Sequence, residues 1–396
     1  MASSSSSSFP TPQKVKKRAF ICSCWSSVFL LSAGFFIATA VFVLTDYRQR
    51  FLGWQLIETV RTSEPTCQDE CKAVGTETLP RGIVSKTSDL EMRPLWGSAK
   101  QHCTFSPLIS LICSQKPKSP MSLLAMAVGI KQKKNVDEIV KKFPLSNFMI
   151  MLFHYDGLVD EWKDLEWSRS AVHVSAPHQT KWWFAKRFLH PDIVADYAYI
   201  FLWDEDLGVQ HFNVARYLSI VKEEGLQISQ PAIDAEISEV HHKLTARENG
   251  SKVHRREINI RGPGRRCFPD SQGPPCTGWV EMMAPVFSSA SWRCVWHIVQ
   301  NDLVHGWGVD FQVGYCAQGN RTANVGVVDT EYLVHYALPT LGGSSNETSN
   351  EAKGQSSSHP SDARNAVRKQ SYVELEIFKN RWGKAVREDK CWVDPF

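Results

Sequence analysis

A run of 26 residues without one charged side chain, from Ala19 to Leu44, restricts what this chain can be more than any other feature of its sequence. An apolar helix of about 20 residues crosses a bilayer, so this run is long enough to span one with some tilt. The residues before it include four basic side chains and no acidic one, which directs the N-terminus to the cytoplasm. The sequence therefore predicts a cytoplasmic tail at 1–18, a transmembrane signal anchor at 19–44 and a lumenal C-terminal part.

A cleaved signal peptide is the alternative interpretation of this segment. Ala38-Thr39-Ala40 has the small-x-small form of a cleavage site. Apolar residues nevertheless continue from Val41 to Leu44, and the whole run is longer than the apolar core of about 7–15 residues that a signal peptide uses. These observations favour an uncleaved anchor and a single-pass type II membrane protein.

Three acceptor triplets for N-linked glycans agree with a lumenal location, although such triplets also arise by chance. They begin at Asn249, Asn320 and Asn346.

Cysteine usage points to the same oxidising environment. The chain has 11 cysteines, of which Cys22 and Cys24 lie in the predicted anchor, so nine remain outside it. An odd number leaves one thiol free or joins two copies of the chain, and we expect such a disulfide-linked homodimer to form through the stem. Cys267 and Cys276 flank a turn rich in proline and glycine and are the first pair that we would join. No cysteine or histidine spacing typical of zinc competes for them.

Composition changes along the chain divide it into segments. Residues 45–93 are polar and interrupted by proline and glycine, as in a stem. From 94 to 340, short apolar runs alternate with amphipathic stretches, which predicts an α/β domain with a mostly parallel sheet flanked by helices. Residues 341–371 are too polar to bury a core and predict a flexible linker. The tail at 372–396 regains apolar residues at helical spacing and is expected to pack on the domain.

The periodicity also predicts individual elements of the domain. We expect strands at 122–128, 148–153, 171–175, 197–203, 279–283 and 324–328. We expect helices at 131–143, 158–167, 180–189, 214–224 and 288–300, and a short one from 310.

The charge balance excludes one class of partner. There are 45 Lys and Arg against 41 Asp and Glu, which gives a net charge of only +4. A chain whose main partner is nucleic acid is usually far more basic, so we expect no nucleic-acid partner.

Three acids directly follow the apolar strand predicted at 197–203. They are Asp204, Glu205 and Asp206. Ligands of open α/β sheets bind at the carboxyl ends of the strands, and carboxylate oxygens suit Mg²⁺ or Mn²⁺. Strand alternation puts Asp204 and Asp206 on one side and Glu205 on the other. The alternative is an acidic cap for the helix that begins near residue 213.

A known family has similar sequence strings. Gln179-Thr-Lys-Trp-Trp-Phe-Ala-Lys-Arg-Phe-Leu-His190, the string from Phe201 to Gly208, and Val373-Glu-Leu-Glu-Ile-Phe378 resemble the plant domain-of-unknown-function family 707. The likeness runs from about residue 95 to the C-terminus. The family carries a label related to lysine-ketoglutarate-reductase trans-splicing, which nothing in this sequence supports. It is grouped with enzymes of the GT-A fold, and an Asp-x-Asp behind a type II anchor and a stem is similar to Golgi glycosyltransferases.

This resemblance implies a reaction and assigns residues to it. The chain would transfer a sugar from a nucleotide-sugar donor to a glycan or glycoprotein acceptor in the Golgi lumen, with Mn²⁺ or Mg²⁺ as cofactor. Asp204, Asp206 and His335 would bind the metal, and Asp310, after a Gly/Trp-rich segment, would accept the proton of the acceptor hydroxyl. The alternatives are a structural hydrogen bond for His335 and a helix N-cap for Asp310.

Further residues are candidates for substrate binding. His154 and Asp156 end a predicted strand, where Asp156 would hold the ribose or base, although a strand-end turn needs such residues anyway. Lys181 is a candidate phosphate ligand, and the alternative is a lysine on a solvated helix face. Glu281 is a further candidate for substrate binding, and Glu281 and Asp234 are the next candidate bases after Asp310. Trp182 and Trp307 are candidate stacking partners for a sugar, although an aromatic residue beside a buried strand usually packs in the core.

A second class of function fits the same sequence. A lumenal binding or scaffold protein with a GT-A-like fold and no catalysis would keep the anchor, the stem and the sheet. The arrangement of the acids, and a cleft above them, would distinguish the two.

The predicted topology has a direct test. When the full chain is expressed in eukaryotic secretory cells, endoglycosidase treatment should increase its electrophoretic mobility, because the three acceptor triplets face the lumen. A variant with Asn249→Gln, Asn320→Gln and Asn346→Gln is the control and should show no change. Unchanged mobility of the parent chain would contradict lumenal glycosylation.

Overall fold

The computed structural model describes residues 41, 44, 72–84, 121–261, 266–338 and 360–395. Apart from residues 41 and 44, the predicted anchor at 19–44 lies outside these ranges, as do most of the stem and Asn346. Within the described ranges, none of the helices combines the length and the apolar character that crossing a membrane requires.

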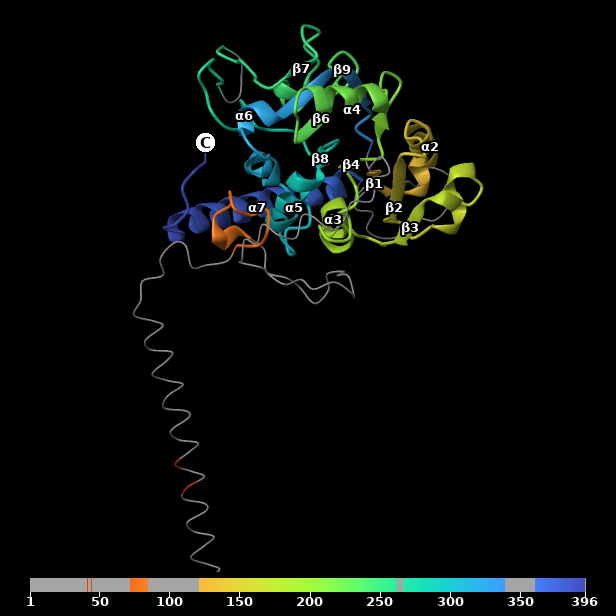
Figure 1. Ribbon diagram of the computed structural model, residues 1–396. Coiled ribbons are helices and arrows are strands. Elements are labelled where there is room, and N and C mark those ends of the chain that lie inside the picture. The colour runs from red at the N-terminus through yellow and green to blue at the C-terminus, as the bar shows by residue number, and fades with distance from the viewer. Residues whose placement is uncertain are drawn as a thin grey trace, which may run out of the picture. The chain divides into compact units, whose positions relative to one another are not determined.

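The domain alternates strands and helices along the chain (Figure 1). The strands are β1 (Ser122–Val128), β2 (Phe148–His154), β3 (Val172–Ser175), β4 (Tyr199–Trp203), β5 (Leu207–Gly208), β6 (Ile228–Ile233), β7 (Val253–His254), β8 (Val286–Ser288) and β9 (Val325–His335). The helices are α2 (Lys133–Val140), α3 (Lys181–Phe188), α4 (Val214–Glu223), α5 (Ser289–Ile298), α6 (Arg321–Asn324) and α7 (Pro360–Glu388). Short 3₁₀ helices include η1 (Arg81–Ile83), η3 (Asp160–Trp162), η4 (Glu166–Ser170) and η6 (Val309–Phe311).

The sheet is mixed: the predicted parallel arrangement holds for part of it, and its other strands pair antiparallel. Its strand order is β3-β2-β1-β4-β8-β6-β9-β5, and β7 also pairs with β9. Strands β3, β2, β1 and β4 are parallel, but β8 runs antiparallel to both β4 and β6. The strand expected at 279–283 is a loop that leads into β8, and β6 was not predicted. Pro231 lies inside β6 at a bulge, and proline in a sequence argues against a strand.

Two hydrophobic cores lie on opposite faces of the sheet because side chains alternate along each strand. In β4, Ile200 and Leu202 join the core under α3, α5 and α7, whereas Phe201 and Trp203 join the core under α2 and α4. The helix expected at 158–167 is instead two 3₁₀ turns, η3 and η4, whose Trp162 and Trp167 fill the second core.

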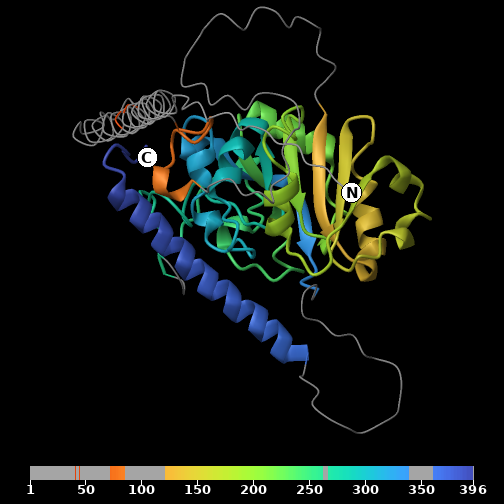
Figure 2. The same ribbon diagram turned by 90° about the horizontal axis from the view of Figure 1, so that it is seen from below.

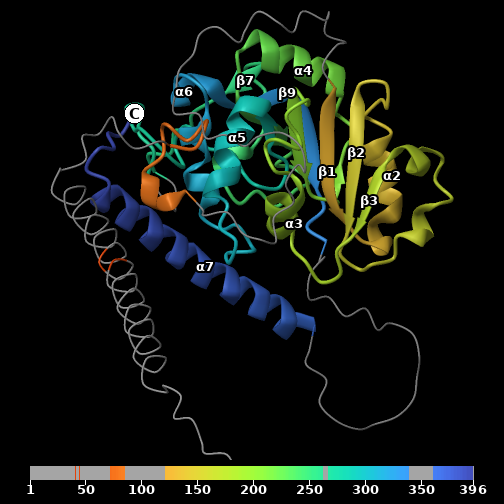
Figure 3. The ribbon, with the colours of Figure 1, turned by 60° about the horizontal axis from the view of Figure 1, so that its bottom comes forward.

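Helix α7 is one long rod, and it packs on the first core from Ser371 onward (Figures 2 and 3). It begins at Pro360, inside the segment predicted as a linker. Its buried positions follow helical spacing: Ser371, Glu374, Phe378 and Ala385. The 72–84 segment, predicted as part of the stem, contacts the end of this helix. Arg81 forms an ion pair with Asp389 at 2.6 Å, and the Trp392 indole donates to the Thr78 carbonyl at 2.8 Å.

Disulfides fix two loops of the domain. Cys267 is joined to Cys276, and Cys294 of α5 is joined to Cys316. Cys391, just after α7, is also disulfide-bonded. The first two of these bonds each tie together segments that are separate in the sequence.

A pair of neighbouring residues tests how α7 is held. Phe378 is 1% exposed and Ile377 is 37% exposed, so only Phe378 loses a packed environment on truncation. Phe378→Ala should lower the free energy of unfolding by about 3–5 kcal/mol, and Ile377→Ala by less than about 1 kcal/mol. Denaturant titration measures both. Equal losses would show that the docked face of α7 is misassigned.

Candidate functional site

The predicted acids lie where three strand ends meet. Asp204 follows β4, and its backbone N–H donates to the Met283 carbonyl at 2.8 Å, which joins the end of β4 to the loop before β8. Strand β9 ends at His335, which pairs with Leu207 of β5. The carboxyl ends of β4 and β9 and the amino end of β8 thus build one site.

Asp204 is paired with Lys181, the first residue of α3. Lys181 Nζ lies 2.6 Å from Asp204 Oδ1 and donates to the Met282 carbonyl at 2.5 Å. The ammonium is well covered, with 10% of the Lys181 side chain exposed against 37% for Asp204. Partial loss of hydration raises the pKa of the Asp204 carboxyl, Lys181 opposes this, and nearby Asp206 adds to the rise.

Asp206 is tied to the segment around the end of β9. Its Oδ2 atom accepts the Leu338 N–H at 3.1 Å and lies 3.4 Å from His335 Nε2. Contact with Asp206 raises the pKa of His335 above its usual value. The predicted metal ligands Asp206 and His335 are therefore neighbours, while Asp204 is occupied by Lys181.

Two further acids complete the cluster. Burial raises the pKa of Glu281 to about 7, and the charges of Asp310 and Asp204 contribute to that rise. Asp310, in η6, accepts the Trp279 indole N–H at 3.2 Å through Oδ2. Its Oδ1 atom is buried and has no hydrogen-bond partner among the described residues. Burial raises the pKa of Asp310 to about 6, although the Trp279 indole and the backbone N–H groups of Phe311, Gly308 and Asp310 itself lower it. Both acids hold a proton far more readily than exposed carboxyls do.

Glu205 points away from these acids, as strand alternation predicts. It accepts the Gly129 N–H at 2.7 Å and the Tyr155 hydroxyl at 2.5 Å, and thereby joins the ends of β1, β2 and β4. Burial raises the pKa of Glu205 to about 8. Sequence reasoning missed this role of Tyr155, since nothing local in the sequence marks it as a partner of Glu205.

His154 and Asp156 lie apart from the acid cluster. His154 is fully buried, with Nε2 2.8 Å from His173 Nδ1, and burial lowers its pKa to about 4. Asp156 accepts the Ile130 and Leu158 N–H groups at 2.6 and 3.0 Å. The prediction that His154 binds substrate is thus replaced by a packing role, because its ring has no exposed surface. The Asp156 contacts match the strand-end turn that was its alternative.

The Gly306-Trp307-Gly308 segment packs between two helices. Gly306 and Gly308 have φ angles of 69° and 96°, which favour glycine. Trp182, 4% exposed, lies directly under Gly306, so its ring belongs to the core instead of stacking on a sugar. Trp307 is 37% exposed and packs edge-on against Tyr372 of α7. This packing determines where Asp310 lies.

Two of the predicted glycan acceptors lie on the surface. Asn249 and Asn320 are exposed, and Asn320 Oδ1 caps α6 by accepting the Thr322 and Ala323 N–H groups.

The described residues do not form a metal site as they stand. No three Asp, Glu, His or Cys side chains in the described part of the chain converge on one point. The donor types suit Mn²⁺ or Mg²⁺, but one oxygen of Asp204 already contacts an ammonium. The arrangement therefore does not fit the predicted metal.

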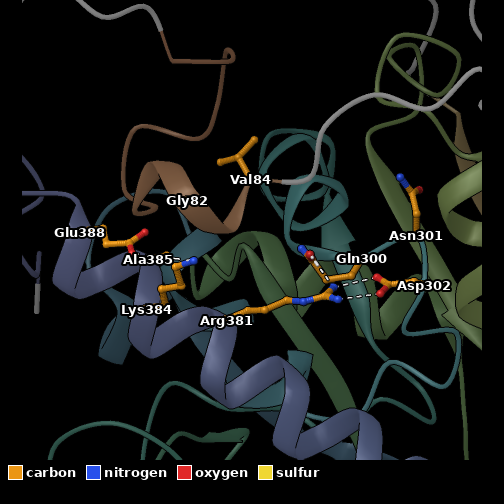
Figure 4. Close-up of a pocket in the computed structure, with 9 residues that line it drawn as sticks. All are labelled: Gly82, Val84, Gln300, Asn301, Asp302, Arg381, Lys384, Ala385 and Glu388. Carbon is orange, nitrogen blue, oxygen red and sulfur yellow. Dashed lines mark hydrogen bonds and ion pairs between the residues drawn. The ribbon is translucent and has the colours of Figure 1, made fainter.

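A cavity of about 420 Å³ has a separate set of lining residues (Figure 4). It is lined by residues of the η1 segment, the loop after α5 and the outer part of α7. Arg381 crosses it and pairs with Asp302 at 2.6 Å. None of its lining residues is one of the predicted site residues.

Residues 70–388 match the model of the family described as "Protein of unknown function (DUF707)", and the chain belongs to this family. This confirms the resemblance found in the sequence. No functionally curated protein matches the chain significantly.

Among solved structures, the fold is similar to two crystal structures of S. aureus TarS. One, of residues 1–349, has a TM-score of 0.34 at 8% identity and covers 54% of this chain and 60% of that one. The other has a TM-score of 0.31 at 10% identity and covers 54% and 36%. The match thus spans less than two thirds of either TarS chain.

The packing of Gly306 beneath the Asp310 loop can be tested with a matched pair. Gly306 and Gly225 have similar φ angles, 69° and 66°, but a Cβ on Gly306 would overlap the Trp182 ring while one on Gly225 meets nothing within 4 Å. Gly225→Ala should cost about 1–2 kcal/mol of unfolding free energy for backbone strain alone, and Gly306→Ala about 1–3 kcal/mol more. Denaturant unfolding measures the difference. Equal costs would contradict the contact.

Proposed function

We propose that this chain is a glycosyltransferase that uses a nucleotide-sugar donor and a glycan or glycoprotein acceptor. The observation that carries the proposal is the Asp310 carboxyl. It is oriented by the Trp279 indole, keeps a buried oxygen without a partner in the described residues, and lies near a second acid, Glu281. Buried acids with raised pKa values are typical of a site for proton transfer.

The reaction would follow from these positions. An acceptor hydroxyl gives its proton to the Asp310 carboxylate. The oxygen of that hydroxyl then bonds to the anomeric carbon of the donor sugar. The bond from that carbon to the diphosphate oxygen breaks, and its electron pair stays on the phosphate. Because the pKa of Asp310 is about 6, the group is a stronger base than an exposed aspartate and is still largely ionised at neutral pH.

The cofactor stays a prediction of the Asp-x-Asp motif. A bound Mn²⁺ or Mg²⁺ would neutralise charge on the departing diphosphate. Since Asp204 is paired with Lys181, the steps assigned to Asp310 do not depend on a metal.

We further propose a Golgi or other endomembrane lumen as the location, behind the anchor at 19–44. The disulfides Cys267–Cys276 and Cys294–Cys316 support an oxidising compartment.

A non-catalytic binding or scaffold protein is the second candidate. It is favoured by the internal pairing of the motif acids, because Asp204 contacts Lys181 and Asp206 contacts His335 and the Leu338 N–H. It is also favoured by the cavity in Figure 4, whose lining includes none of these acids.

The pH dependence of sugar transfer distinguishes the two candidate bases. A general base acts deprotonated, so kcat/KM should rise with pH and level off above the pKa of the base. The midpoint should lie near 6 if Asp310 is the base and near 7 if it is Glu281. Asp310→Asn should abolish the rise near pH 6 and lower kcat by about 10²-fold or more.

The assay uses the full chain with a panel of nucleotide sugars, and follows donor consumption in Mn²⁺ and in EDTA. Asp164→Asn, an exposed acid paired only with Lys133 among the described residues, is the control and should keep the parent rate. If Asp310→Asn consumes donor at the parent rate and Glu281→Gln does not, the base is Glu281 and not Asp310. If no donor is consumed under either condition, the scaffold interpretation replaces the enzyme.

A further inference from the structure

Lys181 has a position that the fold controls tightly. It is the first residue of α3, whose N-cap Thr180 accepts the Trp183 N–H, and the following Trp182 is buried under Gly306. The ammonium is therefore held at the end of β4 by a helix start and a buried aromatic ring. Its contacts with Asp204 Oδ1 and the Met282 carbonyl use two of the three N–H bonds that it can donate.

This position conflicts with a metal on Asp204. Mg²⁺ binds carboxylate oxygens at about 2.1 Å, and an ammonium 2.6 Å from the same oxygen fills the neighbouring space and repels a second cation. A metal would have to displace Lys181. The Lys181 ammonium would then lose its carboxylate partner. Because only 10% of the Lys181 side chain is exposed, water could not replace that partner fully, and the unpaired charge would be destabilising.

We infer that Lys181 takes the place of the divalent cation at Asp204 and donates its remaining N–H to the diphosphate of the donor. This inference rests on the proposed function and specifies how its donor is bound. When the bond between the anomeric carbon and the diphosphate oxygen breaks, the electron pair stays on that oxygen, and the Lys181 ammonium stabilises the added charge without giving up a proton. Asp204 holds the ammonium in place.

Inorganic pyrophosphate is the probe, because it carries the diphosphate common to the donors and needs no knowledge of base or sugar. Isothermal titration calorimetry with the full chain in EDTA should detect pyrophosphate binding. Lys181→Met should weaken it by about tenfold or more, since a charge-assisted hydrogen bond is lost. Lys181→Arg keeps the charge and should bind within a few-fold of the parent. Lys133→Met removes a lysine paired with Asp164 and should bind as the parent does.

A second titration uses Mn²⁺ alone. The parent chain, Lys181→Arg and Lys133→Met should bind it weakly. Lys181→Met frees Asp204 and should bind Mn²⁺ about tenfold or more tightly than the parent, and adding Asp204→Asn should abolish this gain. Circular dichroism of Lys181→Met establishes that the variant is folded.

Three outcomes would overturn the inference: pyrophosphate binding by the parent that requires Mn²⁺, pyrophosphate binding that is the same in Lys181→Met, or Mn²⁺ binding that is equally tight in parent and Lys181→Met. These readouts do not involve sugar transfer. If pyrophosphate binding requires metal but sugar transfer is observed, only the Lys181 inference is wrong. If no donor is consumed in the transfer assay, the proposed function is wrong.

Discussion

Strand β4 lies at the centre of the sheet between β1 and β8, and its residues from Ile200 to Trp203 are fully buried. Because strand β4 is covered on both faces, its side chains alternate between the two hydrophobic cores. A slip of one residue would exchange those faces. The same alternation continues into the acids that follow, so the packing of β4 fixes where Asp204, Glu205 and Asp206 can point. The register of one buried strand thus controls both cores and the candidate site.

The cost of collecting acids at this edge is partly offset by specific partners. Asp204 has an ammonium, Asp206 has His335 and a backbone N–H, and Glu205 has a hydroxyl and a backbone N–H. Glu281 and Asp310 are less well compensated, and burial raises the pKa of each. Carboxyls that resist ionisation are useful for proton transfer and unfavourable for stability at high pH. The site therefore contains three acids with specific partners and two acids, Glu281 and Asp310, whose pKa values are raised by burial.

The C-terminal helix contributes to this site although it is remote in sequence. Gly308 packs against Leu375 and Phe378 of α7, and His305 donates its backbone N–H to Glu374 at 2.9 Å. These contacts hold the loop that leads into Asp310. The 72–84 segment in turn braces the end of α7 through Arg81 and Asp389. The end of the chain and the segment before the sheet are thus parts of one domain that also contains the acids.

Features that depend on local periodicity could be predicted from the residues alone. Alternation and apolar runs located β1, β2 and β4, helical spacing located α3, α4 and α5, and the position of Asp204 to Asp206 after an apolar strand marked the candidate site. The residue pattern did not predict β6 or β8, since Pro231 masks one strand and only three residues form the other. Three contacts of the site arise from tertiary packing. They are the Lys181–Asp204 ion pair and the hydrogen bonds that Tyr155 donates to Glu205 and Trp279 donates to Asp310. Each of these contacts joins residues more than 20 positions apart on different elements, and a periodic pattern carries no information about which distant side chains the packing of a sheet brings together.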